Sequence, residues 1–330
     1  MKILSPEETL VELYPEPVEF ARKQLEVFWL PDEIKVEKDI QDILVNMTES
    51  EKHGVITTLK LFTLYELKAG SEYWGGRFKE QFLRPEFQRM ASVFSMFELA
   101  IHKPFYQKIN ELLHLHTDDF YNSYVEDETL RKRISFIGDI INNLNPLYSL
   151  AGFSFIEGAV LYSSFAFLKH FQSAGKNKIL NISRGINFSV RDENIHAVAG
   201  AWVFKQLKEE ANLTLEERLM LNDSVHNMAK IVYDHECRII DMIFEKGDIE
   251  GITPLQMKRF VESRINQCMI ELGYEKIYDV DYNPVAEWFY KGINGFTFND
   301  TFSGVGNSYV RTWDEASFTY KDYENVPSTS

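Results

Sequence analysis

The chain has 330 residues, of which 45% are hydrophobic and 26% are charged, proportions that are typical of folded globular proteins and exclude a disordered or fibrous chain. With 35 Lys and Arg against 50 Asp and Glu, the formal net charge is -15, which would repel a nucleic-acid backbone or an anionic membrane surface. Cys237 and Cys268 show no CxxC spacing, so neither a disulfide framework nor a zinc-thiolate site is expected.

The first residues, MKILSPEETLVELYPEP, lack the basic and apolar regions of a secretory leader. No uncharged apolar run long enough to span a membrane follows them. We therefore expect a cytoplasmic protein with no membrane segment and no nucleic-acid partner.

Apolar residues recur at spacings of three and four through most of the chain, which is the pattern of amphipathic helices. The predicted fold class is all-α. The start signals include Thr48 with Glu51, which have capping-box spacing, and Pro146 after Asn145. The predicted helices cover about Glu19–Trp29, Thr48–Ser71 with an end near Gly70, Glu86–His114, Asp127–Asn143, Pro146–Phe171, Lys178–Leu207, Leu215–Glu245 and Pro254–Leu272.

The composition changes at about Asn294, where the chain becomes rich in Gly, Ser, Thr, Asn and Asp and loses helical periodicity. This change predicts two parts. Residues 1–293 are expected to form one helical domain, and residues 294–330 a flexible C-terminal tail.

A single acid stands out in the fifth predicted helix, where Glu157 is nearly the only ionisable residue between Tyr148 and Phe167. A helix that is apolar on most faces would carry this carboxylate into the core. An unpaired buried carboxylate costs several kcal/mol or becomes protonated. Coordination to a cation is one of the few arrangements that keep it ionised.

Other predicted helices supply more ligand-type residues. Glu193 and His196 are three residues apart in RDENIH, and Glu98 and His102 are four apart in FELAIH. One such pair alone is usually a solvated surface pair. Together with Glu66 and Glu157, however, they make four glutamates and two histidines on four helices, the ligand inventory of ferritin-like bundles with a dinuclear metal site between four core helices.

The charges of this set are balanced, because four carboxylates and two divalent ions would sum to zero in a core of low dielectric constant. Oxygen and imidazole ligands suit iron and manganese. The predicted metal ligands are therefore Glu66, Glu98, His102, Glu157, Glu193 and His196.

Five segments resemble the small, radical-generating subunit of class I ribonucleotide reductase. They are VFWLPDE, TLYELKAG, AIHKPFY, FIEGAVLY and VRDENIH, and they span most of the predicted bundle. In this resemblance Trp29 takes the position of the radical-transfer tryptophan, Tyr106 that of the radical tyrosine and Asp192 that of the relay aspartate.

One spacing departs from the family pattern, which has Glu-x-x-His in the third helix, whereas Leu99 lies three residues before His102. At 100° per residue, Glu98 would lie about 40° past His102 and the usual glutamate about 60° short of it, so both are on roughly one face. A local π-bulge between Glu98 and His102 would accommodate the extra residue.

The resemblance implies that a dinuclear centre activates O2 and generates a radical, on Tyr106 or on the metals. The radical would pass through His102, Asp192 and Trp29 to the large catalytic subunit, which reduces ribonucleotides. A homodimer is also expected. Fe/Fe is the first choice of metals, with Mn/Fe or Mn/Mn as alternatives. The Mn/Fe alternative is implied by Glu66, which stands where many members have Asp.

The tail is expected to bind the large subunit. The segment NSYV resembles the family segment with the exit tyrosine, which would be Tyr309, while Tyr320 and Tyr323 are rivals. Two other functions use the same ligands: a ferroxidase of the ferritin type, and a di-metal oxidase or monooxygenase. Both lack a radical-transfer partner.

Overall fold

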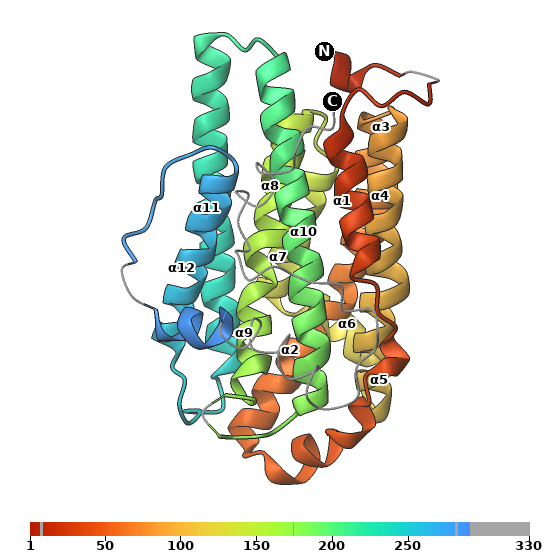
Figure 1. The fold of residues 1–330 in the computed structure, drawn as a ribbon. Coiled ribbons are helices and arrows are strands. Elements are labelled where there is room, and N and C mark those ends of the chain that lie inside the picture. Colours follow the sequence, from red (N-terminus) through yellow and green to blue (C-terminus); the bar gives the residue numbers. More distant parts are fainter. Residues whose placement is uncertain (7–8, 174, 281–282, 291–330) are drawn as a thin grey trace.

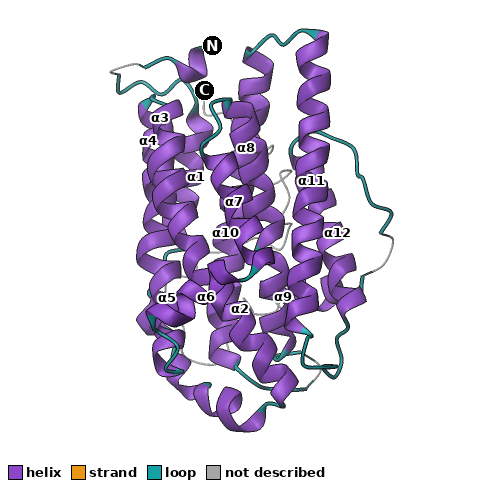
Figure 2. Ribbon diagram, turned by 180° about the vertical axis from the view of Figure 1, so that it is seen from behind, coloured by secondary structure: helices purple, strands orange, loops and turns teal. Residues whose placement is uncertain are grey.

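The computed structural model describes residues 1–6, 9–173, 175–280 and 283–290. The described residues form a bundle of long helices and contain no β-strand, only an isolated bridge between Ile249 and Ile252. Figures 1 and 2 show the helices running alongside one another. The all-α, ferritin-like class is therefore confirmed, while the C-terminal tail lies outside the described residues.

The first half of the chain forms helices that are interrupted by π-helical segments. The α-helices are α1 (Pro15–Glu26), α2 (Glu49–Leu67), α3 (Phe78–Gln81), α4 (Pro85–Phe97), α5 (Lys103–Leu112), α6 (Asp118–Glu126) and α7 (Glu128–Ile141). The chain between α2 and α3 is π-helical over Lys68–Arg77, and that between α4 and α5 is π-helical over Glu98–His102. The predicted capping box of Thr48 and Glu51 begins α2.

The second half contains α8 (Pro146–Phe155), α9 (Tyr162–His170), α10 (Leu180–Glu210), α11 (Leu215–Ile243) and α12 (Pro254–Glu271), with a π-helical segment at Ile156–Val160. In both views α8 and α10 lie between the α1–α4 side and the α11–α12 side (Figures 1 and 2). The stretch Pro146–His170 is long and apolar enough to cross a membrane by composition, but its apolar window is wholly buried within the protein. It is the central core helix of the bundle.

Some predicted boundaries are wrong. The first helix begins at Pro15 because proline suits the first helical turn. The predicted end near Gly70 is not an end, since the chain stays helical to Gln81. No helix was predicted for α6, which begins after Thr117, whose side chain accepts a hydrogen bond from the backbone N–H of Phe120.

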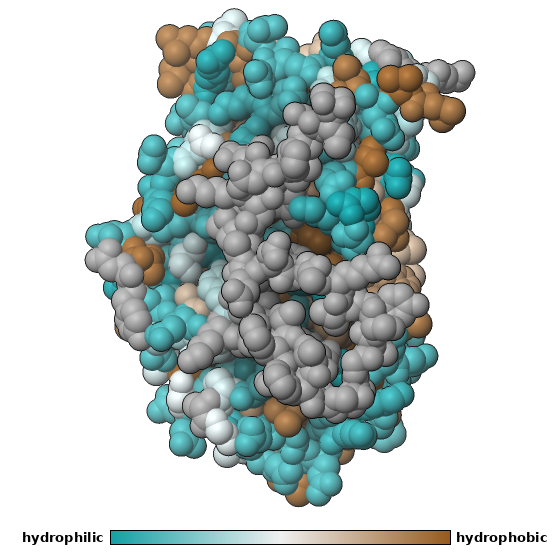
Figure 3. All heavy atoms as spheres, in the orientation of Figure 1, coloured by the Kyte–Doolittle hydropathy of each residue, from teal (hydrophilic) through white to brown (hydrophobic). Residues whose placement is uncertain are grey.

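The core is rich in aromatic side chains, whereas the surface drawn in Figure 3 is mostly polar. Large aromatic side chains such as Trp74, Phe62 and Phe94 are almost completely buried. On the face drawn in Figure 3, the described surface is mostly hydrophilic with scattered apolar residues. The burial of aromatic side chains supplies much of the driving force for packing.

Candidate metal centre

The six predicted ligands come from four long helical rods and meet in the core. Glu66 lies near the end of α2, and Glu98 and His102 are the two ends of the π-helical turn between α4 and α5. Glu157 lies in the π-helical segment between α8 and α9, and Glu193 and His196 lie on α10. Each of the six side chains is at most 1% exposed.

The ligand atoms form two overlapping groups. Within each group, one ligand atom per residue lies within 4.8 Å of the others, and the groups are Glu66, Glu98, His102 and Glu193, and Glu98, Glu157, Glu193 and His196. Glu98 and Glu193 belong to both groups. The geometry therefore offers two adjacent cation positions that share two carboxylates.

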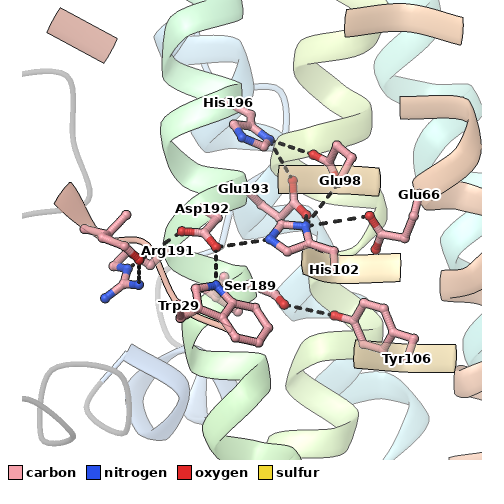
Figure 4. Close-up of polar contacts among 12 residues, drawn as sticks. Trp29, Glu66, Glu98, His102, Tyr106, Ser189, Arg191, Asp192, Glu193 and His196 are labelled. Carbon is pink, nitrogen blue, oxygen red and sulfur yellow. Dashed lines mark hydrogen bonds and ion pairs between the residues drawn. The ribbon is translucent and has the colours of Figure 1, made fainter. Parts of the chain in front are cut away.

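Both histidines present the same ring nitrogen to the carboxylates (Figure 4). Nδ1 of His102 lies 3.1 Å from Glu98 Oε2 and 3.1 Å from Glu193 Oε1. Nδ1 of His196 lies 2.8 Å from Glu98 Oε1 and 3.3 Å from Glu193 Oε2. A nitrogen and a set of carboxylate oxygens facing one point are the donor set of iron and manganese sites.

The cluster also fits cations because six of its eight carboxylate oxygens lack a hydrogen-bond partner. Among the described residues, both side-chain oxygens of Glu66 and Glu193 are buried without a hydrogen-bond partner. The same holds for one oxygen each of Glu98 and Glu157. Buried charged oxygens are stable only when paired or bound to metal. Two divalent ions would neutralise the four carboxylates.

Burial and neighbouring carboxylates shift the pKa values of several groups in the cluster. Burial and the neighbouring carboxylate of Glu98 raise the pKa of Glu66, and burial and Glu193 raise the pKa of Glu157. Burial alone would lower the pKa of His196, but the carboxylates of Glu193 and Glu98 raise it to about 9. Because ligand groups bind metal only when deprotonated, the raised pKa values predict weaker metal binding at low pH.

The π-helical turn at Glu98–His102 is the bulge that the unusual spacing predicted. It accommodates the extra residue and leaves Glu98 fully buried within the cluster. Gly70 allows the neighbouring rod to approach this turn, because a Cβ atom at Gly70 would lie 2.7 Å from Glu98 Cβ. The close approach explains why Gly70 lies inside a helical segment and does not end it.

A hydrogen-bonded chain leads away from the cluster (Figure 4). Asp192 Oδ2 lies 3.1 Å from His102 Nε2 and accepts a 2.8 Å hydrogen bond from Trp29 Nε1. The rings of Trp29 and His102 are also close, with 6.1 Å between their centroids. Because Asp192 engages Nε2 of His102, the other nitrogen, Nδ1, is free to face the carboxylates.

Tyr106 lies beside the cluster in an apolar layer. Its hydroxyl donates to Ser189 Oγ at 3.2 Å, and its ring stacks on Phe62 with 4.3 Å between centroids. Phe62 in turn stacks on Phe165. Burial raises the pKa of Tyr106 well above its usual value, so the phenol is protonated at neutral pH.

Trp74 is a site residue that the sequence did not predict. It lies in the π-helical segment after α2, and its Nε1 donates a 2.9 Å hydrogen bond to Glu157 Oε1. The only signal in the sequence is its position about two helical turns after Glu66. The predicted tail residues Tyr309, Tyr320 and Tyr323 lie outside the described residues.

A family model described as "Ribonucleotide reductase, small chain" matches residues 11–284 of this chain. Among curated proteins, the chain is similar to the ribonucleoside-diphosphate reductase subunit beta of Halalkalibacterium halodurans, with 26% identity over 304 residues that cover 88% of this chain and 84% of that protein.

Solved structures share the fold. A structure of a putative class I ribonucleotide reductase from Bacillus halodurans superposes with a TM-score of 0.75 at 24% identity and covers 84% of this chain and 99% of that one. A dimanganese(II)-NrdF from Streptococcus sanguinis gives a TM-score of 0.75 at 19% identity, with 88% of this chain and 99% of that one covered.

Proposed function

Because this chain belongs to the ribonucleotide reductase small-chain family, an oxidoreductase family, we propose that it generates and stores the radical that a large catalytic subunit uses to reduce ribonucleotides. One observation carries the proposal. Two overlapping groups of buried ligands adjoin both a buried tyrosine, Tyr106, and the chain from His102 through Asp192 to Trp29.

The six ligands would hold two metal ions, with Glu98 and Glu193 shared between them. The donor set suits iron and manganese, so Fe/Fe is our first choice, and Mn/Fe and Mn/Mn are the alternatives. The similar Streptococcus sanguinis protein is a dimanganese(II) form. When bound and reduced, the metal pair would react with O2 and supply the oxidising equivalent.

Tyr106 is suited to store that equivalent. Oxidation removes an electron and the phenolic proton, and the hydrogen bond to Ser189 orients the hydroxyl. The stacked rings of Phe62 and Phe165 exclude water from this side. An apolar, dry surrounding protects a reactive group from side reactions.

The chain from His102 to Trp29 would carry the equivalent to the surface. Asp192 bonds to both rings through one oxygen, so an electron and a proton can move between groups in hydrogen-bond contact. Trp29 is buried, whereas its neighbours Phe28 and Leu30 are 41% and 46% exposed. The tryptophan therefore lies directly under the surface where a partner could bind.

The family implies a large-subunit partner. We further propose a homodimer, with residues 294–330 binding the large subunit and Tyr309 passing the radical to it. We place this activity in the cytoplasm, where the free thiols of Cys237 and Cys268 would stay reduced. The Trp29–Asp192–His102 contacts favour this function over a ferroxidase or a monooxygenase with the same ligands.

The test is aerobic reconstitution with iron, with manganese and with both, followed by electron paramagnetic resonance and by a nucleotide-reduction assay with the large subunit. Tyr106→Phe keeps the stacking on Phe62 but removes the oxidisable hydroxyl. We expect it to abolish a tyrosyl radical signal and to lower activity at least 100-fold, with two metal ions per chain retained.

A Tyr106→Phe protein with full activity would contradict storage on Tyr106 and favour a metal-centred oxidant. A wild-type protein that binds metal but supports no nucleotide reduction with any large subunit would contradict the proposed function. Tyr124→Phe is the matched control, since Tyr124 is also a buried tyrosine but lies on α6, which carries none of the six predicted ligands.

A further inference from the structure

The π-helical segment Ile156–Val160 holds Glu157 in the metal centre, but its backbone is irregular. The chain returns to an α-helix only at Tyr162. Where π-helical and α-helical hydrogen bonding meet, carbonyl groups lose their regular donors. Buried carbonyl groups need replacement donors.

Two buried arginines supply such donors. Arg264 Nε of α12 donates a 2.9 Å hydrogen bond to the carbonyl oxygen of Gly158. Arg133 Nη2 of α7 donates a 3.1 Å hydrogen bond to the carbonyl oxygen of Val160. The two arginines are 2% and 3% exposed. Bonds from a charged donor are stronger than those between neutral groups.

Arg133 is itself held by an acid. Its Nη2 lies 3.1 Å from Glu236 Oε1 of α11. The other oxygen of Glu236 accepts a hydrogen bond from the hydroxyl of Ser163 in α9. Glu236 thus ties Arg133 to the helix that follows the π-helical segment.

Arg264 is fixed by aromatic partners. Its Nη1 donates a 2.7 Å hydrogen bond to the Tyr290 hydroxyl, and its guanidinium carbon lies 3.8 Å from the centre of the Tyr162 ring. Gly158 allows α12 to pack directly on the segment, because a Cβ atom there would lie 2.5 Å from Cys268 Sγ. The backbone of the segment and the guanidinium of Arg264 are therefore in direct contact.

Neither arginine belongs to the ligand groups or to the chain through Asp192. Burying a guanidinium costs free energy unless the group is paired and hydrogen-bonded. We propose that Arg133 and Arg264 are positioning residues that lock the π-helical segment and so hold Glu157 in the metal centre. The metal-binding part of this inference rests on the proposed function.

The physical reason is helical register. A π-helical turn contains one more residue than the α-helical turn that could replace it. Loss of the lock would let the segment relax toward an α-helix, and a shift of one residue turns a side chain by about 100°. Glu157 would then leave the hydrogen bond with Trp74 and the second ligand group.

The experiment uses the full chain with Arg264→Met, and with Arg133→Met combined with Glu236→Gln so that no unpaired acid remains. Glu236→Gln alone separates the loss of the acid from the loss of Arg133. Arg84→Met is the control for loss of a buried arginine, because Arg84 pairs with Glu86 at the start of α4. Arg264→Lys tests rescue by another charged donor.

Two quantities are measured. The first is amide hydrogen exchange of residues 156–162 in protein treated with a chelator. The second is the number and affinity of Mn(II) ions bound per chain without oxygen, using Mn(II) alone as the probe. The exchange measurement requires no metal, so it tests the lock even where the proposed function fails.

For Arg264→Met and for Arg133→Met with Glu236→Gln we expect at least ten-fold faster exchange of these amides. We also expect one Mn(II) ion to be lost or bound at least ten-fold more weakly. Arg264→Lys should recover most of both values, and Arg84→Met should match wild type. Glu236→Gln, which removes the acid that holds Arg133, should fall between wild type and the double variant. Should Arg264→Met fail to fold, Arg264→Gln replaces it.

Wild-type exchange and wild-type Mn(II) affinity in the folded arginine variants would overturn the inference. Faster exchange with unchanged Mn(II) binding would overturn its second half, the link to Glu157. If wild type itself binds no Mn(II), the proposed metal centre is wrong, and the exchange rates alone decide whether the arginines lock the segment.

Discussion

Asp192 joins two parts of the molecule through one oxygen atom. Oδ2 engages both Trp29 Nε1 and His102 Nε2. This sets the orientation of the His102 ring, so that its Nδ1 faces Glu98 and Glu193. One aspartate thus joins the cluster of predicted ligands to the buried ring of Trp29 and leaves Nδ1 of His102 as the nitrogen available for coordination.

Lys169, unlike Asp192, is a buried ionisable residue with few polar partners. Its ammonium donates to Asn187 Oδ1 and lies 5.7 Å from the centre of the Phe289 ring. Burial lowers the pKa of Lys169 to about 7. In the unfolded chain a lysine keeps its proton up to about pH 10.4.

The pKa difference predicts a pH-dependent stability. Below about pH 7 the buried lysine lowers the free energy of unfolding by its full amount. This loss of stability shrinks as the pH rises toward the pKa of the unfolded chain, because the lysine is then neutral in both states. Lys169→Met should therefore raise the free energy of unfolding by up to a few kcal/mol at pH 7, at about 1.4 kcal/mol per pKa unit, and by much less at pH 10.

Urea denaturation at both pH values measures this difference. The loss of the hydrogen bond to Asn187 changes the free energy of unfolding by the same amount at both pH values. The difference between the effects at pH 7 and pH 10 therefore reports the pKa of Lys169. Lys258→Met is the control, because Lys258 is partly exposed and pairs with Asp241. An equal effect of Lys169→Met at pH 7 and pH 10 would show that the lysine is not neutral in the folded protein.

Residue patterns indicated the candidate ligands but not the residues that hold them in place. Glu157 stood out as an isolated acid in an apolar helix, and Glu193 with His196 as a same-face pair. Trp74, Arg133 and Arg264 did not stand out in the sequence. Their side chains donate hydrogen bonds to Glu157 and to backbone carbonyl groups that are distant in the chain. Such contacts have no signature in local spacing.

At the scale of elements, the main feature is that three of the four ligand-bearing rods contain π-helical segments. Glu98–His102 and Ile156–Val160 carry ligands, and Lys68–Arg77 follows Glu66 and carries Trp74. Only the first of the three was predictable, since the spacing of Glu98 and His102 exceeds the usual one. The others leave the periodicity of apolar residues almost unchanged.

Gly70 tests the packing of these segments. In Gly70→Ala the new methyl group would lie 2.7 Å from Glu98 Cβ and from Leu99 Cγ, so the two rods must separate. We expect a loss of about 1–3 kcal/mol in stability, the usual cost of overpacking, and at least ten-fold weaker Mn(II) binding.

Thermal unfolding and Mn(II) titration provide the measurements. Gly138→Ala is the matched control: Gly138 lies within α7, and a Cβ atom there would meet nothing within 4 Å. This control should be neutral or stabilising by up to about 1 kcal/mol. Wild-type stability and metal affinity in Gly70→Ala would show that the close approach of the two rods is not required.

At the scale of the whole molecule, the sequence was sufficient to predict a helical bundle whose candidate ligands lie on four rods. Periodicity identified the long helices, and Thr48 with Glu51 marked a start correctly. The end expected at Gly70 was wrong because tertiary packing, and not a turn, explains that glycine. The homodimer, the boundary at residue 294 and the role of Tyr309 stay predictions, since they concern partners or residues outside the described chain.

The most direct test is anomalous X-ray scattering at the manganese edge from crystals of the protein loaded with Mn(II). We predict two peaks per chain, one surrounded by Glu66, Glu98, His102 and Glu193, and one by Glu98, Glu157, Glu193 and His196. The absence of both peaks, or peaks only outside these six side chains, would contradict the dinuclear centre on which the proposed function rests.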